Sequence, residues 1–368
     1  MLIANYDFRA IPFDSIESCG ARMLLYTKTF SIFYTLNRYC NYACSYCWPF
    51  AHSSEKLFRP ATTVIATVDE IKRQARERGF TSFNLAFSGG EPTFHPGFLD
   101  IVEHLADDTA RCDLQILNLT TNLSRGTIWW LDFILATNKL HDVFVSASWH
   151  HEVHAHDLVV QRELFAEKVA LLQANSVQQT IIIVMIPALW DVLYADAAYF
   201  RSRGQNVTLR PLITADGSRV VDEYDDGMLR IMQTSMLHQL QHGPTNRPNG
   251  TAPTVPLVEI ATNEEPDRII EPLTELKDKT GTTYYLDTAS RMTTLDFTHF
   301  KGWACNAGFQ SAVVREPAGT VHRGLACRDA PLGHVDTGFR LFDGAVPCIT
   351  ETCVSGFDSK LPKRRLSW

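Results

Sequence analysis

The sequence lacks any run of 18 apolar residues and any long basic stripe. A membrane-spanning helix needs about 20 mostly apolar residues, so no membrane partner is expected. The one basic run, 363–365, lies near the end of the chain and the net charge is -7, which gives no reason to expect a nucleic-acid partner. The first ten residues lack a charged segment followed by an apolar one, so no secretory signal is expected. These absences predict a cytoplasmic protein.

The chain also lacks internal repeats and low-complexity tracts. Its 45% hydrophobic and 20% charged residues are typical of a globular protein. The 368 residues are enough for one large domain and a smaller one.

Apolar runs alternate with amphipathic segments through the first two thirds of the sequence. A helix is expected to start at Thr67, an N-cap followed three residues later by Glu70. Apolar strands separated by helices favour a parallel sheet covered by helices, so we expect an α/β protein with a partial (β/α)6 TIM-like barrel. The expected strands are 31–37, 82–87, 113–119, 142–148, 180–187 and 206–212, and the expected helices are 67–79, 98–105, 127–137, 160–175 and 190–203.

The pattern changes after about residue 215. We expect a linker containing a helix near 224–241, a strand pair formed by 282–287 and 292–297, and then a hairpin with Gly319 in its turn. The predicted divisions of the chain are an N-terminal extension at 1–30, the partial barrel at 31–215, a linker with a helix and a β-hairpin at 216–300, a small β-rich domain at 301–356 and a tail at 357–368.

Nine cysteines in a cytoplasmic chain suggest metal binding or catalysis, since disulfides are disfavoured there. Cys19 and Cys112 stand alone, and packing explains them. The other seven form two groups, Cys40, Cys44 and Cys47 near the start, and Cys305, Cys327, Cys348 and Cys353 near the end.

The first cysteine group follows the expected strand 31–37 and has the spacing CxxxCxxC. It fits a zinc site with His52 as the fourth ligand, or an iron–sulfur cluster with one iron left open. The segment "SGGEP", 88–92, follows the next strand, so it is expected at the same edge of the sheet. Glycines there allow the backbone to approach a ligand closely, and Glu91 could accept hydrogen bonds from an ammonium group.

"CNYACSYC", 40–47, together with "SGGEP" resembles the radical S-adenosylmethionine (radical SAM) superfamily over residues 31–212. The resemblance implies a [4Fe–4S] cluster on Cys40, Cys44 and Cys47, with S-adenosylmethionine bound at the free iron. It implies reductive cleavage to a 5′-deoxyadenosyl radical that abstracts a hydrogen atom from the substrate, with an electron donor such as flavodoxin or ferredoxin.

The resemblance also implies roles by position. Tyr46 lies near the adenine, the segment 88–91 holds the methionyl amine, and strand 180–187 flanks the adenine. Arg210 could pair with the carboxylate of S-adenosylmethionine or with substrate, although a satisfied polar group at the sheet edge is an equal alternative for it and for Asn122. The implied cofactor-binding residues are Tyr46, Ser88, Gly89, Gly90, Glu91, Asn122, Ser146 and Ser148.

The second cysteine group resembles the twitch or SPASM auxiliary-cluster domains of the superfamily. Four cysteines are enough for one closed auxiliary [4Fe–4S] cluster, which favours electron transfer over substrate binding. A structural zinc ion with four cysteine ligands is the alternative that spacing leaves open.

The run "WHHEVHAHD", 149–157, contains four histidines but no HExxH motif. Because it follows the expected strand 142–148, we interpret it as a loop that faces the substrate. His150 or His151 would then be a polar contact or a proton carrier.

Three functions are compatible with the sequence. The first is a radical SAM enzyme that oxidises or rearranges a small molecule, such as a sugar, aminocyclitol or nucleoside. The second is a maturase that crosslinks or epimerises a ribosomal peptide, although only 39 residues precede Cys40, too few for a leader-binding domain. The third is a zinc-stabilised binding protein without enzymatic activity.

Overall fold

The computed structural model describes residues 10–47, 52–107, 113–140, 142–215, 219–232, 274–286, 291–327 and 331–366. Cys112 lies outside these residues. Within the described residues, every helix is too short or too polar to cross a membrane.

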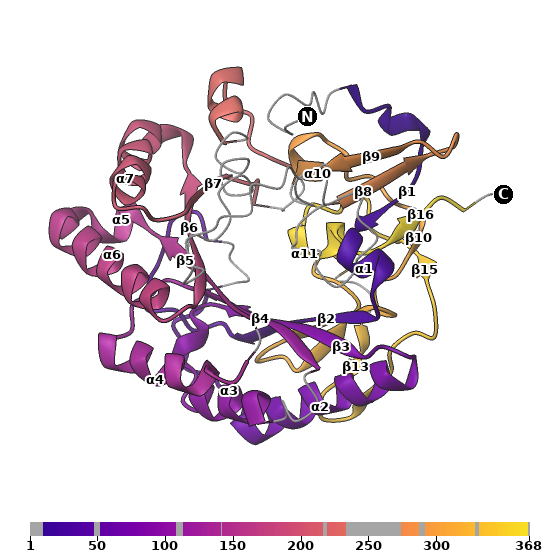
Figure 1. Cartoon of the computed structure of the whole chain (residues 1–368), viewed down its shortest axis with the longest axis horizontal. Coiled ribbons are helices and arrows are strands. Elements are labelled where there is room, and N and C mark those ends of the chain that lie inside the picture. Colours follow the sequence, from indigo (N-terminus) through magenta and orange to yellow (C-terminus); the bar gives the residue numbers. More distant parts are fainter. Residues whose placement is uncertain are drawn as a thin grey trace.

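The larger sheet has ten strands in the order β14-β13-β12-β11-β2-β3-β4-β5-β6-β7. Its six consecutive strands β2 to β7 are parallel, and β11 joins them as a further parallel strand beside β2. The sheet is curved and remains open at β7 (Figure 1). The strands are β2 (Thr29–Asn37), β3 (Ser82–Gly89), β4 (Leu114–Thr121), β5 (Asp142–Trp149), β6 (Gln178–Met185), β7 (Val207–Pro211), β11 (Ser311–Arg315), β12 (Thr320–His322), β13 (Pro331–His334) and β14 (Gly338–Phe339).

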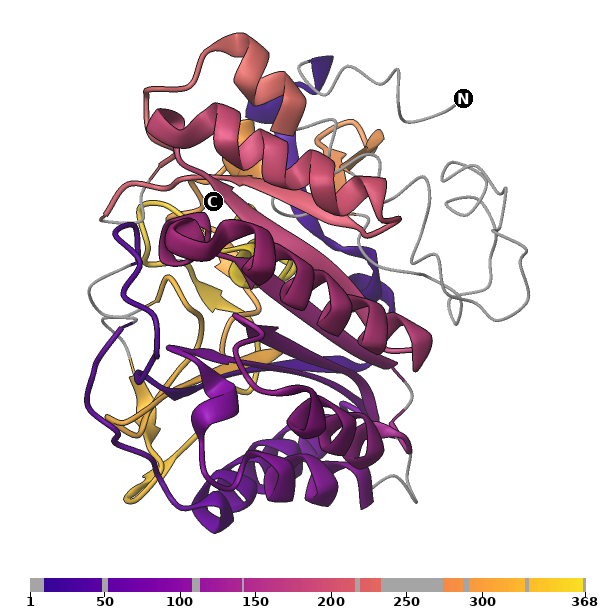
Figure 2. The same cartoon turned by 90° about the vertical axis from the view of Figure 1, so that its left-hand side faces the viewer.

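The helices at 61–77, 98–107, 127–137, 158–174 and 190–202 cover the outer side of the curved sheet, and each comes in the chain after a parallel strand (Figure 1). Figure 2 shows the helices of residues 158–202 running alongside their strands. The helices are α1 (Arg22–Tyr26), α2 (Ala61–Glu77), α3 (Phe98–Asp107), α4 (Thr127–Thr137), α5 (His151–His154), α6 (Leu158–Ala174), α7 (Trp190–Ser202), α10 (Arg291–Thr294) and α11 (Gly356–Ser359).

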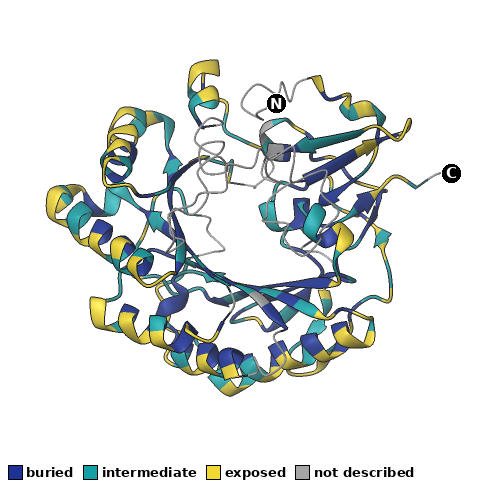
Figure 3. Ribbon diagram, viewed as in Figure 1, coloured by how far each residue is buried: buried dark blue, intermediate teal, exposed yellow. Residues whose placement is uncertain are grey.

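The main hydrophobic core fills the space between the parallel strands and the helices. Alternate strand residues such as Phe30, Leu85 and Val145 point into this core. Figure 3 shows the strands largely buried and the outward faces of the helices exposed. The remaining strand residues face the inner, concave side of the sheet.

A second sheet of six strands lies across the opening of the first, in the order β15-β10-β16-β1-β8-β9 (Figure 1). It has its own hydrophobic core, formed by residues that include Ile16, Leu276 and Phe300. Its strands are β1 (Ile16–Ala21), β8 (Thr274–Asp278), β9 (Thr283–Leu286), β10 (Ala304–Cys305), β15 (Val346–Pro347) and β16 (Lys363–Arg364).

Several sequence predictions need correction. Helix α2 starts at Ala61, because Pro60 precedes it with an extended backbone, and Thr67 lies inside it with its hydroxyl donating to the Thr63 carbonyl. Residues 283–286 pair with β8, and 291–294 form a helix, so the strand pair 282–287 with 292–297 is wrong. Of the helix expected at 224–241, residues 226–232 are helical and those after 232 lie outside the described residues.

Candidate active site and second cysteine site

The loop that carries the first three cysteines leaves the end of β2 and is fixed to the end of β3. The two strands are parallel neighbours, with Asn37 paired to Gly89. The Gly90 N–H donates to the Asn37 carbonyl at 2.9 Å, and the Glu91 N–H donates to the Tyr39 carbonyl at 2.7 Å. The start of the cysteine loop is therefore an extension of the sheet edge.

The two glycines of the segment 88–92 allow the end of β3 to lie this close to the backbone of the cysteine loop. Gly89 has a φ of +148°, and a Cβ atom there would lie 2.2 Å from the Asn37 carbonyl oxygen. A Cβ atom on Gly90 would lie 2.3 Å from the Tyr39 carbonyl oxygen. Both glycines are thus needed because the chain's own backbone lies in close contact with them. The sequence suggests a different reason, the close approach of a ligand.

Glu91 is buried and holds together the ends of β3 and β4. Its carboxylate accepts hydrogen bonds from the Thr93 N–H at 3.1 Å, the Thr93 hydroxyl at 2.6 Å and the Thr121 hydroxyl at 2.8 Å. It also accepts one from the Asn122 N–H at 2.6 Å. Burial raises the pKa of Glu91, and these hydrogen bonds oppose the shift. Glu91 therefore positions Asn122 at the cysteine loop.

Asn122 contacts the cysteine loop directly. Its side-chain Nδ2 donates to Asn41 Oδ1 at 3.0 Å and lies 3.7 Å from the sulfur of Cys40. The Tyr42 N–H donates to the same sulfur at 3.4 Å. The Cys40 sulfur thus already has two N–H donors around it.

His150 and Tyr46 lie together on the other side of the loop. His150 Nδ1 is 3.2 Å from the sulfur of Cys44 and 2.6 Å from the Tyr46 hydroxyl, and the two rings stack at 6.0 Å. Burial, followed by the neighbouring His154, lowers the pKa of His150 to about 4. Burial therefore favours the neutral imidazole, whose hydrogen bonds position Tyr46 and Cys44.

His151 points elsewhere. Its Nδ1 lies 2.6 Å from Asp196 of α7, and that buried carboxylate also accepts from Trp149 at 2.7 Å and Arg162 at 3.1 Å. Asp196 therefore joins β5, α5 and α6 to α7, and the His151 ring is held there instead of at the cysteine loop. Glu152, the next residue, does contact the cysteine loop, because it accepts from the Ser45 N–H and hydroxyl at 2.6 and 2.8 Å.

Ser146, Ser148 and Arg210 lie on the concave face of the sheet. They alternate with Val145, Ala147 and Leu209, which belong to the core on the other face. Ser146 is buried, Ser148 is partly buried and Arg210 is accessible to solvent.

The three thiols of the loop are near enough to affect one another. Burial raises the pKa of Cys40 to about 11 and that of Cys44 to about 12, and in both cases neighbouring thiols add to the rise. Burial raises the pKa of Cys47 as well.

The four C-terminal cysteines are all buried and come from three separate segments, since Cys348 and Cys353 share the connection between β15 and α11. Cys305 ends β10, Cys348 follows β15, Cys327 follows β12, and Cys353 precedes α11. Pairing of β10 with β15, and the hydrogen bond from the Cys348 N–H to the Trp303 carbonyl at 2.7 Å, bring two of these segments together.

Electrostatic effects connect all four C-terminal thiols. Burial raises the pKa of Cys353 well above its ordinary value, and Cys305 and Cys348 add to this rise. Burial raises the pKa of Cys327 to about 11, and Cys305 contributes. Every cysteine in the described residues is a free thiol, and no group of three or more His, Cys, Asp or Glu side chains there is already arranged as a metal site.

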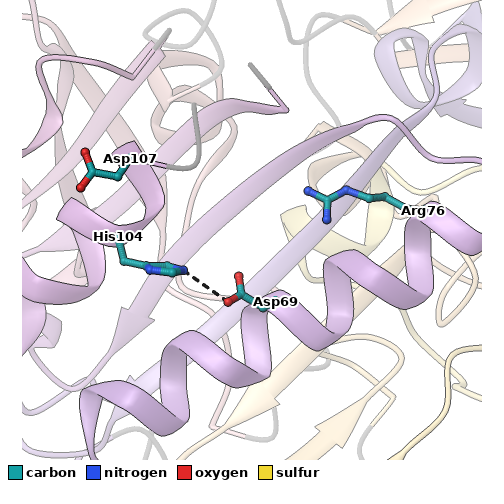
Figure 4. Close-up of a pocket in the computed structure, with 4 residues that line it drawn as sticks. All are labelled: Asp69, Arg76, His104 and Asp107. Carbon is teal, nitrogen blue, oxygen red and sulfur yellow. Dashed lines mark hydrogen bonds and ion pairs between the residues drawn. The ribbon is translucent and has the colours of Figure 1, made fainter. Parts of the chain in front are cut away.

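A pocket on the outer surface lies between α2 and α3, away from these residues (Figure 4). It is lined by Asp69, Arg76, His104 and Asp107, and His104 lies 3.3 Å from Asp69. It contains none of the predicted site residues.

Three further residues near the cysteines, Tyr42, Glu152 and Arg323, were not predicted as site residues from the sequence. Tyr42 lies between the first two cysteines and Glu152 directly follows the paired histidines, so position in a motif could have indicated both. Arg323 is a buried residue near Cys327 whose Nη1 donates to the Pro347 carbonyl at 3.1 Å. No local pattern in the sequence indicates its burial.

Comparison with known proteins agrees with this geometry. Residues 34–148 match the family model described as "Radical SAM superfamily". No curated protein sequence matches the chain. The solved structure "Native anSMEcpe with bound AdoMet" is similar, with a TM-score of 0.51, 14% identity and alignment over 84% of this chain and 79% of that chain.

A second similar structure is "Native anSMEcpe with bound AdoMet and Kp18Cys peptide". It has a TM-score of 0.52 and 14% identity, and it covers 84% of this chain and 79% of that chain. At this level of identity the likeness shows a shared fold.

Proposed function

The chain is a radical SAM enzyme, and we propose that it oxidises or rearranges a polar small molecule such as a sugar, aminocyclitol or nucleoside. Enzymes of this class contain a [4Fe–4S] cluster and bind S-adenosylmethionine, which together supply abstraction of a hydrogen atom from the substrate. The observation that carries the proposal is the fixed position of the cysteine loop at the edge of the parallel sheet, beside its concave face.

The three thiols of the loop fit a cluster with one open iron. Cys40, Cys44 and Cys47 lie in one loop, and the N–H groups of Tyr42 and Asn122 point at the sulfur of Cys40. Thiolate is the preferred ligand of iron–sulfur clusters, and hydrogen bonds to sulfur tune them. We assign these three cysteines to the cluster that works with S-adenosylmethionine.

The concave face next to the loop is the proposed place for S-adenosylmethionine and the substrate. Tyr46, Ser146 and Ser148 would contact the cofactor, together with the segment 88–91 and Asn122. Because Glu91 is already hydrogen-bonded within the chain, its part would be to hold the Asn122 backbone in place. His150 would hold Tyr46.

Polar side chains on this face favour a polar substrate. Asn84 and Asn118 on β3 and β4 are partly buried there, and Asn84 Oδ1 has no hydrogen-bond partner among the described residues. Arg210 on β7 adds a positive charge. Amide and guanidinium groups match the hydroxyl, amine and carboxylate groups of small metabolites.

The second cysteine group fits a closed auxiliary [4Fe–4S] cluster on Cys305, Cys327, Cys348 and Cys353. Arg323 supports this assignment, since its buried Nε and Nη2 have no hydrogen-bond partner among the described residues. A cluster with four thiolates carries a net negative charge, which the positive charge of Arg323 would offset.

We further propose a partial barrel at 31–215 as the body of the enzyme, and an external electron donor such as flavodoxin or ferredoxin.

A peptide is the second candidate substrate. One of the solved structures with this fold holds a bound peptide. A ribosomal-peptide maturase therefore belongs in the same test.

Two measurements on anaerobically reconstituted protein test the proposal. Metal analysis should find about eight irons per chain, two clusters. Formation of 5′-deoxyadenosine should then increase with one class in a panel of sugars, aminocyclitols, nucleosides and peptides. Stimulation by peptides alone would replace the small-molecule proposal with the maturase, and zinc without iron would leave only a zinc-stabilised binding protein.

A further inference from the structure

Strand β16 places a buried lysine between two cysteines. Lys363 is the direct partner of Cys305 on β10 and of Cys19 on β1. Residues directly opposite one another on neighbouring antiparallel strands point to the same face of the sheet. The side chains of Cys305, Lys363 and Cys19 therefore form a row, and their exposed fractions are 3%, 4% and 1%.

The ammonium group of Lys363 is fixed in this position. Its Nζ donates to the carbonyls of Asp358, Leu361 and Ser359 at 2.6, 3.1 and 3.3 Å, which uses all three of its N–H groups. The ring of Phe300 lies 5.0 Å away. Among the described residues no carboxylate oxygen lies within 4.0 Å of Nζ, so the charge has no direct ion-pair partner.

The buried groups that could compensate this charge are three thiols and the carboxyl group of Asp358, which also raises the pKa of Lys363. Burial lowers the pKa of Lys363, but Cys353, Cys305 and Cys19 raise it, and the net shift is upward. In return, Lys363 lowers the pKa of all three thiols against the larger effect of burial. Two of these thiols, Cys305 and Cys353, are proposed ligands of the second cluster.

A fixed cation beside an iron–sulfur cluster changes its reduction potential. The potential depends on net charge, burial and hydrogen bonds to sulfur. Adding one electron makes a four-thiolate cluster more negative, so a nearby positive charge favours the reduced form. Loss of that charge should make the cluster harder to reduce.

We propose that Lys363 raises the reduction potential of the cluster bound by Cys305, Cys327, Cys348 and Cys353. Lys363 acts through the cysteines and is a positioning residue. The proposal rests on the proposed function, which assigns an iron–sulfur cluster to these four cysteines.

The test is a redox titration of the second cluster followed by electron paramagnetic resonance. In a chain with Cys40, Cys44 and Cys47 replaced by Ala, only the second cluster remains, and dithionite supplies one electron to it. Lys363→Met should lower the equilibrium constant for reduction at least tenfold, a drop of about 59 mV for one electron. Lys363→Arg keeps the charge, so its reduction potential should differ from that of the parent by less than half of that shift.

Lys277→Met is the matched control. Lys277 lies on β8 of the same sheet, is exposed, and is paired with Ser18, the neighbour of Cys19, so it points to the opposite face. This variant should titrate like the parent. A potential in Lys363→Met equal to that of the parent would overturn the proposal.

Cluster loading separates the remaining outcomes. If Lys363→Met fails to bind iron but Lys363→Arg binds about four irons, the charge is needed for cluster assembly. The potential is then measured in Lys363→Gln, and a value equal to that of the parent overturns the proposal. If both variants lose iron, Lys363 has a packing role and the proposal fails. Zinc or no metal in the parent chain contradicts the proposed function itself, before any variant is compared.

Discussion

At the scale of single residues, the segment 88–92 shows how a correct motif can have an unexpected physical reason. The sequence marks Gly89 and Gly90 as places where a ligand could approach. In the structure the close neighbours are the carbonyls of Asn37 and Tyr39, so the glycines position the cysteine loop. Sequence cannot distinguish these reasons, because both need a residue without a Cβ atom.

Gly90→Ala should displace the cysteine loop. The new Cβ atom would lie 2.3 Å from a backbone oxygen, and backbone must move to accommodate it. We expect the free energy of unfolding to fall by about 1–3 kcal/mol, as for other overpacked sites. We also expect the first site to bind less iron while the second keeps roughly four irons. Chemical denaturation and metal analysis would measure the two effects.

Gly344→Ala is the control for this variant. A Cβ atom on Gly344 meets nothing within 4 Å, so both stability and iron content should match the parent. Full iron loading of the first site in Gly90→Ala would show that the loop does not depend on this contact.

The paired histidines show where residue-level prediction fails. His150 and His151 are equivalent in sequence, yet His150 lies at the cysteine loop and His151 at the buried Asp196. The difference arises because α5 begins between them, at His151. The position of a helix start within two residues is beyond what sequence patterns can determine.

At the scale of elements, the alternation of strands and helices through residue 211 was predictable. The apolar run 180–187 is short and rich in β-branched residues, which favours a buried strand, and the structure places β6 at Gln178–Met185. The second sheet was not predictable. Its strands β10, β15 and β16 have two residues each, and β1 pairs with segments more than 250 positions away.

The pairing of β11 with β2 connects the end of the chain to the central sheet. Five residue pairs in parallel register join Ser311–Arg315 to 31–35. The larger sheet therefore crosses the boundary expected at residue 301, and β1 brings the N-terminal segment into the second sheet.

A chain that ends at residue 300 should fail to fold as an independent barrel. It would leave β2 with an unpaired, apolar edge, which promotes aggregation. We expect little soluble protein and no cooperative thermal transition by circular dichroism, whereas a chain ending at 366, which keeps every described strand, should behave like the parent. A soluble fragment with a sharp transition would show that the barrel is independent of the C-terminal strands.

At the scale of the whole molecule, two sheets carry two cysteine sites of different design. The first lies in one loop at the edge of the parallel sheet, next to an accessible polar face. The second collects four buried thiols from separate segments that the smaller sheet and its neighbours hold together. We propose that the accessible site carries out chemistry on the substrate and that the buried site transfers electrons.

The most direct test of this account is the formation of 5′-deoxyadenosine from S-adenosylmethionine under reducing, anaerobic conditions. The parent protein should form it, and the variant with Cys40, Cys44 and Cys47 replaced by Ala should form none while still binding roughly four irons. Formation of 5′-deoxyadenosine by the alanine variant at the rate of the parent would contradict the assignment of the first cysteine site.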